Sequence, residues 1–441
     1  MTTSNLNLDI QAAWERSILA ASRDDTALML TVTARRPART QTRDRAPIDL
    51  AFVLDRSGSM DGDKLDLVKR AVIEALAYLN PDDRVALVVF DNEIDVLQRF
   101  APASGEVRDA IGHGLRTLEA RGGTNLSGGW LTGCGQLAEH APHPSAARLR
   151  RAILLTDGQA NDGILDPGEL ARHATALRQR GISTSTMGVG EGFDEMLLSG
   201  LAEAGGGNFV YIEHPAELPA FFEHEIGGLT ALAALRPQLE ITLPLGTRGV
   251  LLNAFPNERH GKTITVELRD LVDGDRIELV MMVTHRGRVW GESATLGCTA
   301  RYVDPESSDY RGFVVDVPPL TLVPDGEARH APVDHAVAFA RAREQARLDQ
   351  REALRLDRAG RHAESRQMFA ASHGRLHEVD AAAAAGGYAG IKAAAMEEMR
   401  TESSRAHSLA SAPAAPLDER THKERAARHA RSSRGDRNPR S

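Results

Sequence analysis

Between residues 47 and 235 the chain alternates short apolar, β-branched runs with longer segments of helical periodicity. The runs are apolar on both faces, as strands of a parallel sheet must be when helices cover both of its sides. This alternation predicts right-handed βαβ crossovers and an open, doubly wound, mostly parallel α/β sheet. The expected strands are IDLAFVL, RVALVVF, RAILLT and STSTMGV, and the expected helices lie near residues 64–79, 106–118, 128–139, 166–179 and 195–204.

After Pro237 the apolar residues recur with a period of two, which is typical of half-buried antiparallel strands. The turn Asp273-Gly274 separates two of these strands. We therefore expect a small antiparallel β-sandwich at residues 236–330. The alternating residues are Ile264, Val266, Leu268, Ile277, Leu279, Met281, Val283, Ala294, Leu296, Cys298, Ala300 and Tyr302.

One alternating run, from Leu28 to Ala34, lies in the N-terminal segment 1–46 and has no partner nearby in the sequence. We expect this strand to pair within the sandwich. The α/β domain at residues 47–235 would then be an insertion in the sandwich rather than a domain that precedes it.

Residues 331–400 return to helical periodicity, with a break at Ala359-Gly360 that predicts a hairpin of two or three helices. The hairpin could dock a partner, but a single helix pair is better interpreted as a packing element on the sandwich.

The tail at residues 401–441 has few large apolar side chains and is predicted to be disordered. It carries nine Lys and Arg residues against five Asp and Glu residues. It is interpreted as solvated rather than as a binding arm.

Composition limits the classes of function. The net charge is −8, and because the tail contributes +4, residues 1–400 carry −12. An acidic folded part with only 4% aromatic residues argues against binding of nucleic acid or anionic lipid. The sequence contains no long apolar run and no N-terminal signal pattern, so we expect a cytoplasmic protein without a membrane span. Cys134 and Cys298 are expected to be buried thiols, not zinc ligands or a disulfide.

Polar side chains with oxygen donors follow three of the predicted segments at one edge of the sheet. Asp55, Ser57 and Ser59 come directly after the first strand, and Asp157 follows RAILLT. Thr124 lies in the glycine-flanked loop ARGGTNLSGG, immediately before a helix. Ligands of open α/β sheets bind beyond the carboxyl ends of the strands, so these five groups are expected to converge. Hard oxygen donors favour Mg²⁺, and also Mn²⁺ or Ca²⁺, over Zn²⁺ or copper.

The charge of this donor set indicates how it would be used. With two carboxylates and three neutral hydroxyls as ligands, a divalent ion keeps residual positive character and at least one open position. An anionic oxygen from outside would complete the coordination best. A Glu or Asp carboxylate on a protein partner is the expected ligand at the open position.

The set D-x-S-x-S at Asp55, Ser57 and Ser59, followed by GGT at Thr124 and TDG at Asp157, resembles the metal-ion-dependent adhesion site of von Willebrand factor type A domains. The resemblance covers roughly residues 47–235. It implies that both serines and Thr124 contact Mg²⁺ directly or exchange with water, while both aspartates act mainly through bound waters. More loosely, the region after Pro237 is similar to the β-sandwich of bacterial proteins related to the calcium-activated chloride channel group.

Other interpretations of these segments are weaker. DGDKLD at residues 61–66 lacks the glycine and distal glutamate of a calcium loop, so it is interpreted as a helix start. RSGSM is not a nucleophile elbow, and no histidine is placed by the sequence to activate Ser57 or Ser59 for hydrolysis. GVGEG at residues 188–192 lacks the dinucleotide-binding pattern and is expected to form a loop beside the metal edge.

The sequence therefore predicts a non-enzymatic, metal-dependent protein-binding module that acts as a scaffold or assembly factor. The alternative is a regulatory subunit of an AAA+ ATPase or chelatase-type machine. Because the chain has no P-loop, it would be the non-motor partner.

Overall fold

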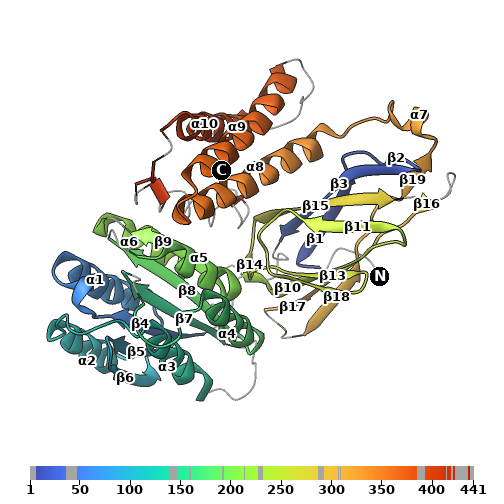
Figure 1. Ribbon diagram of the computed structural model, residues 1–441. Helices are drawn as coiled ribbons and strands as arrows, with labels where there is room; N and C mark the ends of the chain where they lie inside the picture. Colours follow the sequence, from blue (N-terminus) through green and yellow to red (C-terminus); the bar gives the residue numbers. More distant parts are fainter. Residues whose placement is uncertain are drawn as a thin grey trace.

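The computed structural model contains an α/β domain, a β-sandwich and a group of C-terminal helices (Figure 1). The predicted fold class is confirmed, and the α/β domain is inserted in the sandwich. The residues that the structure describes are 6–35, 47–139, 148–157, 160–190, 193–212, 214–226, 232–286, 293–305, 307, 309–384, 393–413, 415–418, 421–422 and 436–437.

The α/β domain is built on a six-stranded sheet with the order β6-β5-β4-β7-β8-β9. All neighbouring strands are parallel except β5 and β6, which pair antiparallel. The strands are β4 (Ile48–Asp55), β5 (Arg84–Phe90), β6 (Ile94–Pro102), β7 (Leu149–Thr156), β8 (Ile182–Val189) and β9 (Gly206–Ile212). The helices are α1 (Asp63–Ala77), α2 (Gly105–Arg116), α3 (Leu126–Glu139), α4 (Pro167–Gln179), α5 (Glu195–Ala204) and α6 (Leu218–Glu225).

Helices cover both faces of this sheet, because alternate residues of each central strand point to opposite sides. Leu50 and Phe52 of β4 face the core formed with α1, α2 and α6. Ala51 and Val53 of the same strand face the core formed with α3, α4 and α5. Both faces of β4 are therefore fully buried, which explains its continuous apolar sequence.

Helix α3 packs closely on the sheet through glycines. A Cβ atom at Gly129 would lie 2.4 Å from Cδ1 of Phe90, and one at Gly133 would lie 2.3 Å from Cγ2 of Val53. Glycine at these two positions therefore lets the helix backbone approach the strands. Because α3 directly follows the loop that contains Thr124, this contact helps to fix that loop at the sheet edge.

The sandwich contains strands from both sides of the inserted domain. β3 (Arg23–Ala34) pairs antiparallel with β15 (Asp275–Arg286) and with β1 (Leu8–Trp14). Leu28, Leu30 and Val32 thereby enter the same core as the strands that follow the insertion. One sheet has the order β1-β3-β15-β11 and the other β12-β13-β10-β17-β18. The remaining strands of these sheets are β10 (Leu232–Thr242), β11 (Thr247–Leu251), β12 (Asn257–His260), β13 (Thr263–Glu267), β17 (Gly297–Val303) and β18 (Tyr310–Val314).

Small elements complete the sandwich. β14 (Leu271–Val272) pairs with β10, and β20 (Asp436–Arg437) pairs with β15. β16 (Ser293–Ala294), β19 (Leu320–Val323) and β2 (Ile18–Ala20) form a three-stranded sheet. The short helix α7 (Asp325–Ala328) follows β19.

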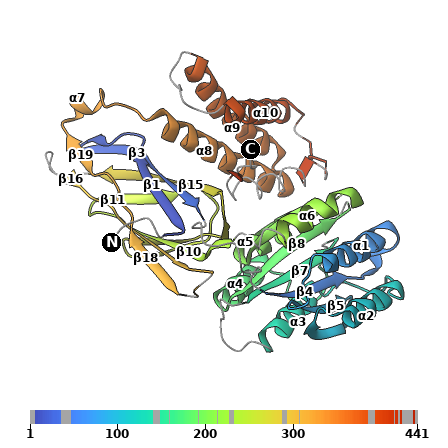
Figure 2. The same ribbon diagram turned by 180° about the vertical axis from the view of Figure 1, so that it is seen from behind.

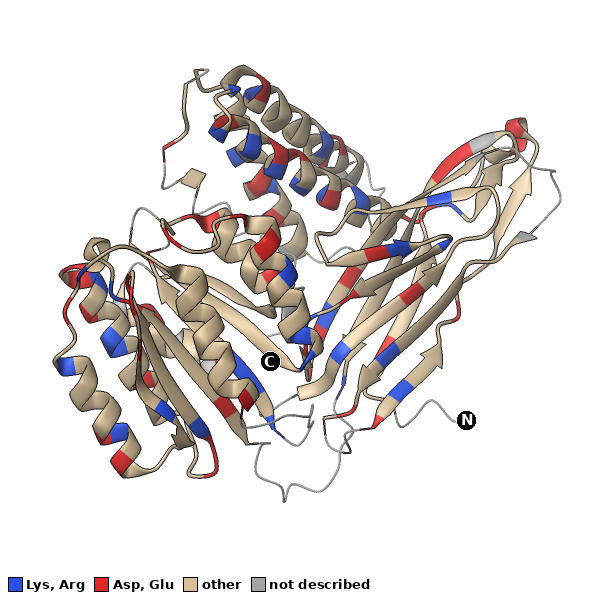
Figure 3. Ribbon diagram, turned by 60° about the horizontal axis from the view of Figure 1, so that its bottom comes forward, with Lys and Arg blue, Asp and Glu red and all other residues tan. Residues whose placement is uncertain are grey.

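Three long helices follow: α8 (His335–Arg358), α9 (His362–Ala384) and α10 (Ala393–Ala410). α8 runs from the β3–β15 sheet, where Val337 and Ala340 are buried, to the α/β domain (Figures 1 and 2). Acidic and basic residues are interleaved along these helices (Figure 3). Helix α8 packs on the sandwich, as predicted for this region, and also pairs with α5 of the α/β domain. Helix α9 packs on α8, and α10 packs on α9.

The boundary predicted at residue 400 is wrong, since it falls within α10. Beyond this helix, Leu417 packs with Phe369 and Leu354, so part of the predicted tail has folded contacts. Alanine-rich sequence on both sides of residues 385–392 hides the start of α10, because alanine carries no amphipathic pattern. The tail was also predicted to be disordered at residues 423–435 and 438–441. These residues lie outside the part of the chain that the structure describes.

The sequence pattern did not predict the strands β6 and β9 or the α-helix α6 of the α/β domain. Successive glycines usually indicate a turn, but Gly206 and Gly207 begin β9. A Cβ atom at Gly207 would lie 2.1 Å from the backbone oxygen of Thr184 on β8, so glycine is required by close strand contact. Glycine at position 207 therefore reflects the packing of two strands and not a turn.

Candidate metal centre

Asp55 is the last residue of β4 and is held by hydrogen bonds from two segments. Its Oδ1 accepts a hydrogen bond from the backbone N–H of Ser57 at 2.8 Å. Its Oδ2 accepts one from the hydroxyl of Thr156, the last residue of β7, at 2.5 Å. The carboxylate is fully buried. It is therefore fixed between the ends of two adjacent parallel strands, at the edge where the sequence placed it.

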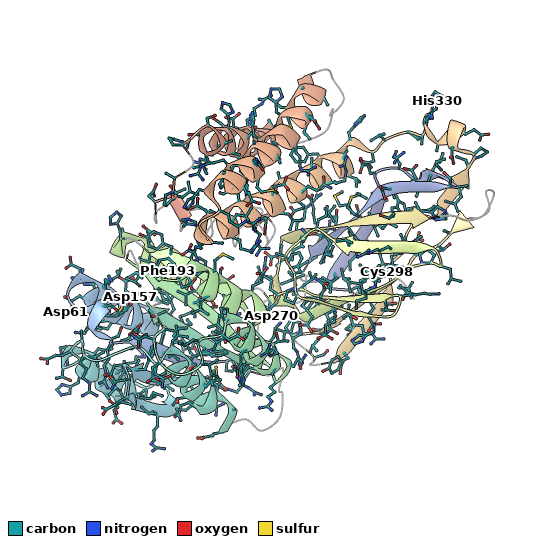
Figure 4. The ribbon with its side chains drawn as sticks, viewed as in Figure 1. Asp61, Asp157, Phe193, Asp270, Cys298 and His330 are labelled. Atoms are coloured by element: carbon teal, nitrogen blue, oxygen red, sulfur yellow. The ribbon has the colours of Figure 1, made fainter. Side chains whose placement is uncertain are left out.

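A chain of hydrogen bonds connects this segment with Asp157. The hydroxyls of Ser57 and Ser59 lie 3.1 Å apart, and the Ser59 hydroxyl donates to Oδ1 of Asp157 at 2.9 Å. Asp157 directly follows β7 and lies beside the start of α1 (Figure 4). Ser57 and Asp157 are buried, whereas Ser59 is exposed. Four of the five predicted residues thus share one continuous polar cluster that opens to solvent at Ser59.

Thr124 is brought to the same edge by backbone hydrogen bonds of its loop. The N–H of Gly58 donates to the carbonyl of Gly122 at 3.1 Å. On the other side, the N–H of Thr124 donates to Oδ1 of Asn161 at 2.8 Å, and Asn161 returns a hydrogen bond to the Thr124 carbonyl at 3.1 Å. The loop is therefore fastened to the segments that follow both β4 and β7. Gly122 has φ +70°, a conformation that favours glycine.

Two cations near this edge were not anticipated. Lys64 donates from Nζ to Oδ2 of Asp157 at 2.7 Å. Arg56, between the predicted ligands, is buried and donates to Asp91 at 2.8 Å and to Asp95. Arg56 is thus neutralised by partners of its own. No polarity pattern in the sequence points to the contact of Lys64, because its partner Asp157 lies 93 residues away.

Comparison with known proteins identifies the inserted domain. A sequence profile of the von Willebrand factor type A domain matches residues 49–224. Residues 49–224 form a von Willebrand factor type A domain. The matched range covers the α/β part of the chain and includes the positions of the five predicted ligands.

Two solved structures share the fold over most of the chain. A von Willebrand factor type A protein from Catenulispora acidiphila superposes with a TM-score of 0.62, covering 86% of this chain and 90% of that one at 19% identity. The ArnB paralog VWA2 from Sulfolobus acidocaldarius gives a TM-score of 0.63, with 97% and 99% covered at 15% identity. The combination of type A domain, sandwich and helices therefore recurs.

A relative in Synechocystis, the uncharacterized protein sll0103, is 28% identical over 291 residues. The match covers 63% of this chain and 66% of that protein, just under two thirds of its length.

Type A domains are modules of metal-dependent protein–protein interaction. In the part of the chain that the structure describes, no helix carries an apolar stretch long enough to span a bilayer.

The donor chemistry of the type A domain fits a hard divalent ion. The five groups offer only oxygen atoms. Among the described residues, no group of three or more His, Cys, Asp or Glu side chains gathers in a metal-binding arrangement, so a site richer in charge is not present there. Cys134 and Cys298 are buried free thiols, as predicted, and burial raises the pKa of each to about 12.

Burial also raises the pKa of the Asp55 carboxyl to about 6, and the charge of Asp157 adds to this effect. Hydrogen bonds from Ser57 and Thr156 act in the opposite direction and stabilise the charged form. At neutral pH the metal-free type A domain therefore holds a carboxylate that burial destabilises. A bound cation would relieve that cost.

This shift predicts how the stability of the metal-free protein depends on pH. Between pH 3.8 and about 6 the folded state retains a proton on Asp55 that the unfolded chain releases, so stability falls as pH rises through this window. We expect Asp55→Asn to stabilise the metal-free protein above pH 6 by at most about 3 kcal/mol, and to leave it nearly unchanged below pH 3.8. Urea unfolding in chelator at both pH extremes measures the difference.

The exposed Asp61 supplies the control for this measurement. Asp61→Asn removes the same charge from the adjacent segment without removing a buried carboxylate. Its effect on the unfolding free energy should be small at both pH values. A stabilisation by Asp55→Asn that is the same at low and high pH would contradict the assigned pKa shift.

Proposed function

We propose that the chain is a non-enzymatic scaffold or assembly factor whose type A domain binds a protein partner through a divalent ion. Asp55, Ser57, Ser59, Thr124 and Asp157 would hold the ion, Mg²⁺ first and Mn²⁺ or Ca²⁺ as substitutes. A Glu or Asp carboxylate of the partner would occupy the remaining position. The bound ion would supply the positive charge that links the carboxylates of this chain to the carboxylate of the partner.

The observation that carries this proposal is the connected oxygen cluster, in which only two of the five predicted ligands are charged and one of these, Asp157, is paired with Lys64. Asp55 and Asp157 are the two carboxylates, and the hydroxyls of Ser57 and Ser59 lie between them. The exposure of Ser59 gives an external ligand access to the cluster. The buried Asp55 holds the backbone of Ser57, so the serine loop keeps its geometry without the ion.

Contacts between the type A domain and the other parts of the chain support a role as a scaffold. Arg178 on α4 is buried and donates to the carbonyl of Leu268 in the sandwich. Arg358 at the end of α8 pairs with Glu195 and Asp194 at the start of α5. The type A domain is thus fastened to both other parts. A partner bound at the metal edge would be held in a defined orientation to the sandwich and helices.

The surroundings of Ser59 argue against a hydrolase. Its hydroxyl donates to the carboxylate of Asp157 and contacts the hydroxyl of Ser57. A serine nucleophile needs a base that accepts its proton, and within the described residues no histidine is hydrogen-bonded to Ser59. Asp157 is already engaged by Lys64. A turnover assay compares the wild type with Ser59→Ala. Equal activity in the two proteins would exclude Ser59 as a nucleophile.

Recovery of partners from cell extract tests the proposal. The wild type and Asp55→Ala are used as bait, each with Mg²⁺ and with chelator. We expect specific partners only for the wild type with Mg²⁺, enriched about tenfold or more over the other three conditions. The same partners in all four conditions would rule out a metal bridge. Exposed Asp61→Ala provides a bait with the same charge loss.

The identity of the recovered partner separates the two predicted roles. An AAA+ ATPase among the metal-dependent partners would favour the regulatory-subunit alternative over a general scaffold. Recovery from the cytoplasmic fraction would support the predicted location of the chain. The similarity of the sandwich to proteins related to the chloride channel group stays a prediction.

A further inference from the structure

A lysine is hydrogen-bonded directly to the candidate metal centre. Lys64 donates from Nζ to Oδ2 of Asp157 at 2.7 Å and to the backbone carbonyl of Ser59 at 3.0 Å. The side chain of Asp157 is 3% exposed and that of Lys64 is 29% exposed. The ammonium therefore lies beside a buried carboxylate, where solvent and salt screen charges weakly.

The fold fixes the position of this ammonium. Gly190, just after β8, lies against the Lys64 stem: a Cβ atom there would be 2.8 Å from Cε and 3.3 Å from Cδ. The exposed acids Asp61 and Asp63 are close to Lys64 in sequence, yet its ion pair is formed with the buried Asp157. The loop after β8 thus supports the stem while the ammonium contacts the metal centre.

This cation changes the charge of the centre. Asp55 and Asp157 together carry two negative charges, and Lys64 offsets one of them. A divalent ion would therefore leave the centre with one net positive charge instead of none. Because like charges at short range in a partly buried site repel strongly, Lys64 should oppose the ion and attract an anion.

We propose that Lys64 is a specificity-determining residue of the metal centre, which weakens binding of the divalent ion alone and favours its retention together with a carboxylate. This inference rests on the proposed function. Lys64 acts as a second cation of the site, so that a loaded centre without a partner is short-lived. Metal binding and capture of an acidic protein partner become coupled events.

Titration of the chelator-treated full chain with Mn²⁺ tests this role, with free Mn²⁺ measured by electron paramagnetic resonance. Lys64→Met keeps an unbranched stem against Gly190 but removes the charge. We expect it to bind Mn²⁺ about tenfold more tightly than the wild type. Lys64→Gln should show the same direction, whereas Lys64→Arg, which keeps the charge, should remain close to the wild type.

A matched control lies on the same helix. Lys69 pairs with the exposed Asp66 at 3.8 Å, so Lys69→Met removes one positive charge away from the centre. Its Mn²⁺ affinity should change less than about twofold. Replacing chloride with acetate should tighten Mn²⁺ binding more in the wild type than in Lys64→Met, because acetate supplies the carboxylate that the positive centre attracts.

The outcomes separate this inference from the proposed function. If the wild type binds Mn²⁺ and both Lys64→Met and Lys64→Gln, folded by circular dichroism, bind it equally or more weakly, the role of Lys64 is overturned and the metal centre stands. If neither the wild type nor the variants bind Mn²⁺, both proposals fail. An equal gain in affinity in Lys69→Met would also overturn the inference, because the effect would then be one of net charge.

Discussion

Replacing Asp55 with alanine should reduce the affinity for Mn²⁺ about a hundredfold, since residues that only support metal ligands already contribute tenfold to a hundredfold. Asp55 provides one of the two negative charges of the centre and also positions its serine loop. Its Oδ1 accepts the N–H of Ser57, while its Oδ2 accepts the hydroxyl of Thr156. Alanine removes the charge and both hydrogen bonds. Isothermal titration of the chelator-treated full chain with Mn²⁺ measures the change.

The control for this prediction also tests an alternative site. Asp61→Ala removes an exposed acid six residues after Asp55, within the segment DGDKLD that superficially resembles a calcium loop. Its affinity for Mn²⁺ should stay within about twofold of the wild type. A large loss of Mn²⁺ affinity in Asp61→Ala together with a small loss in Asp55→Ala would show that the metal binds at that segment and not at the sheet edge.

The position of the candidate site could be predicted because strand ends are strong sequence signals. The run that ends at Asp55 and the run before Asp157 are apolar on both faces, so each had to be a central strand. Parallel strands bring their carboxyl ends to one edge, and residues 102 apart in the sequence meet there without any further information. The metal itself, and the role of each ligand toward it, stay predictions.

Lys64 illustrates what the sequence pattern could not provide. The segment DGDKLD at residues 61–66, which contains Lys64, was interpreted only as a helix start. Its actual partner, Asp157, lies 93 residues away, and the contact depends on how α1 leaves the sheet edge. Side-chain direction at the start of a helix is set by backbone angles that a polarity pattern does not contain.

Elements with weak patterns were missed for related reasons. β6 is an antiparallel edge strand with partly exposed residues, so it lacks the continuous apolar sequence of the central strands. β9 begins with two glycines, which usually indicate a turn. In contrast, the strand at Leu28–Ala34 was correctly assigned to the sandwich, because an alternating strand without a local partner must find a distant one.

Replacing Glu225 with alanine should lower the free energy of unfolding of the type A domain by about 3–5 kcal/mol, because it leaves a buried cation without its partner. Glu225 is in the last turn of α6, and its side chain is fully buried. Its Oε1 accepts a hydrogen bond from Arg151 on β7 at 2.7 Å and another from the hydroxyl of Ser185 on β8. Its Oε2 accepts one from Asn208 on β9. The Glu225 carboxylate thus connects α6, the last helix of the type A domain, to the three strands β7, β8 and β9.

A double variant distinguishes the buried charge from simple loss of packing. In Glu225→Leu combined with Arg151→Met, no buried charge is left unpaired, so we expect most of the stability lost in Glu225→Ala to return. Urea unfolding midpoints of the full chain, with chelator present, measure both changes. Equal destabilisation of the double and single variants would show that the hydrogen bonds to Ser185 and Asn208, not the ion pair, hold α6 in place. Because α6 precedes the connection to β10, the same carboxylate anchors the point where the inserted domain returns to the sandwich.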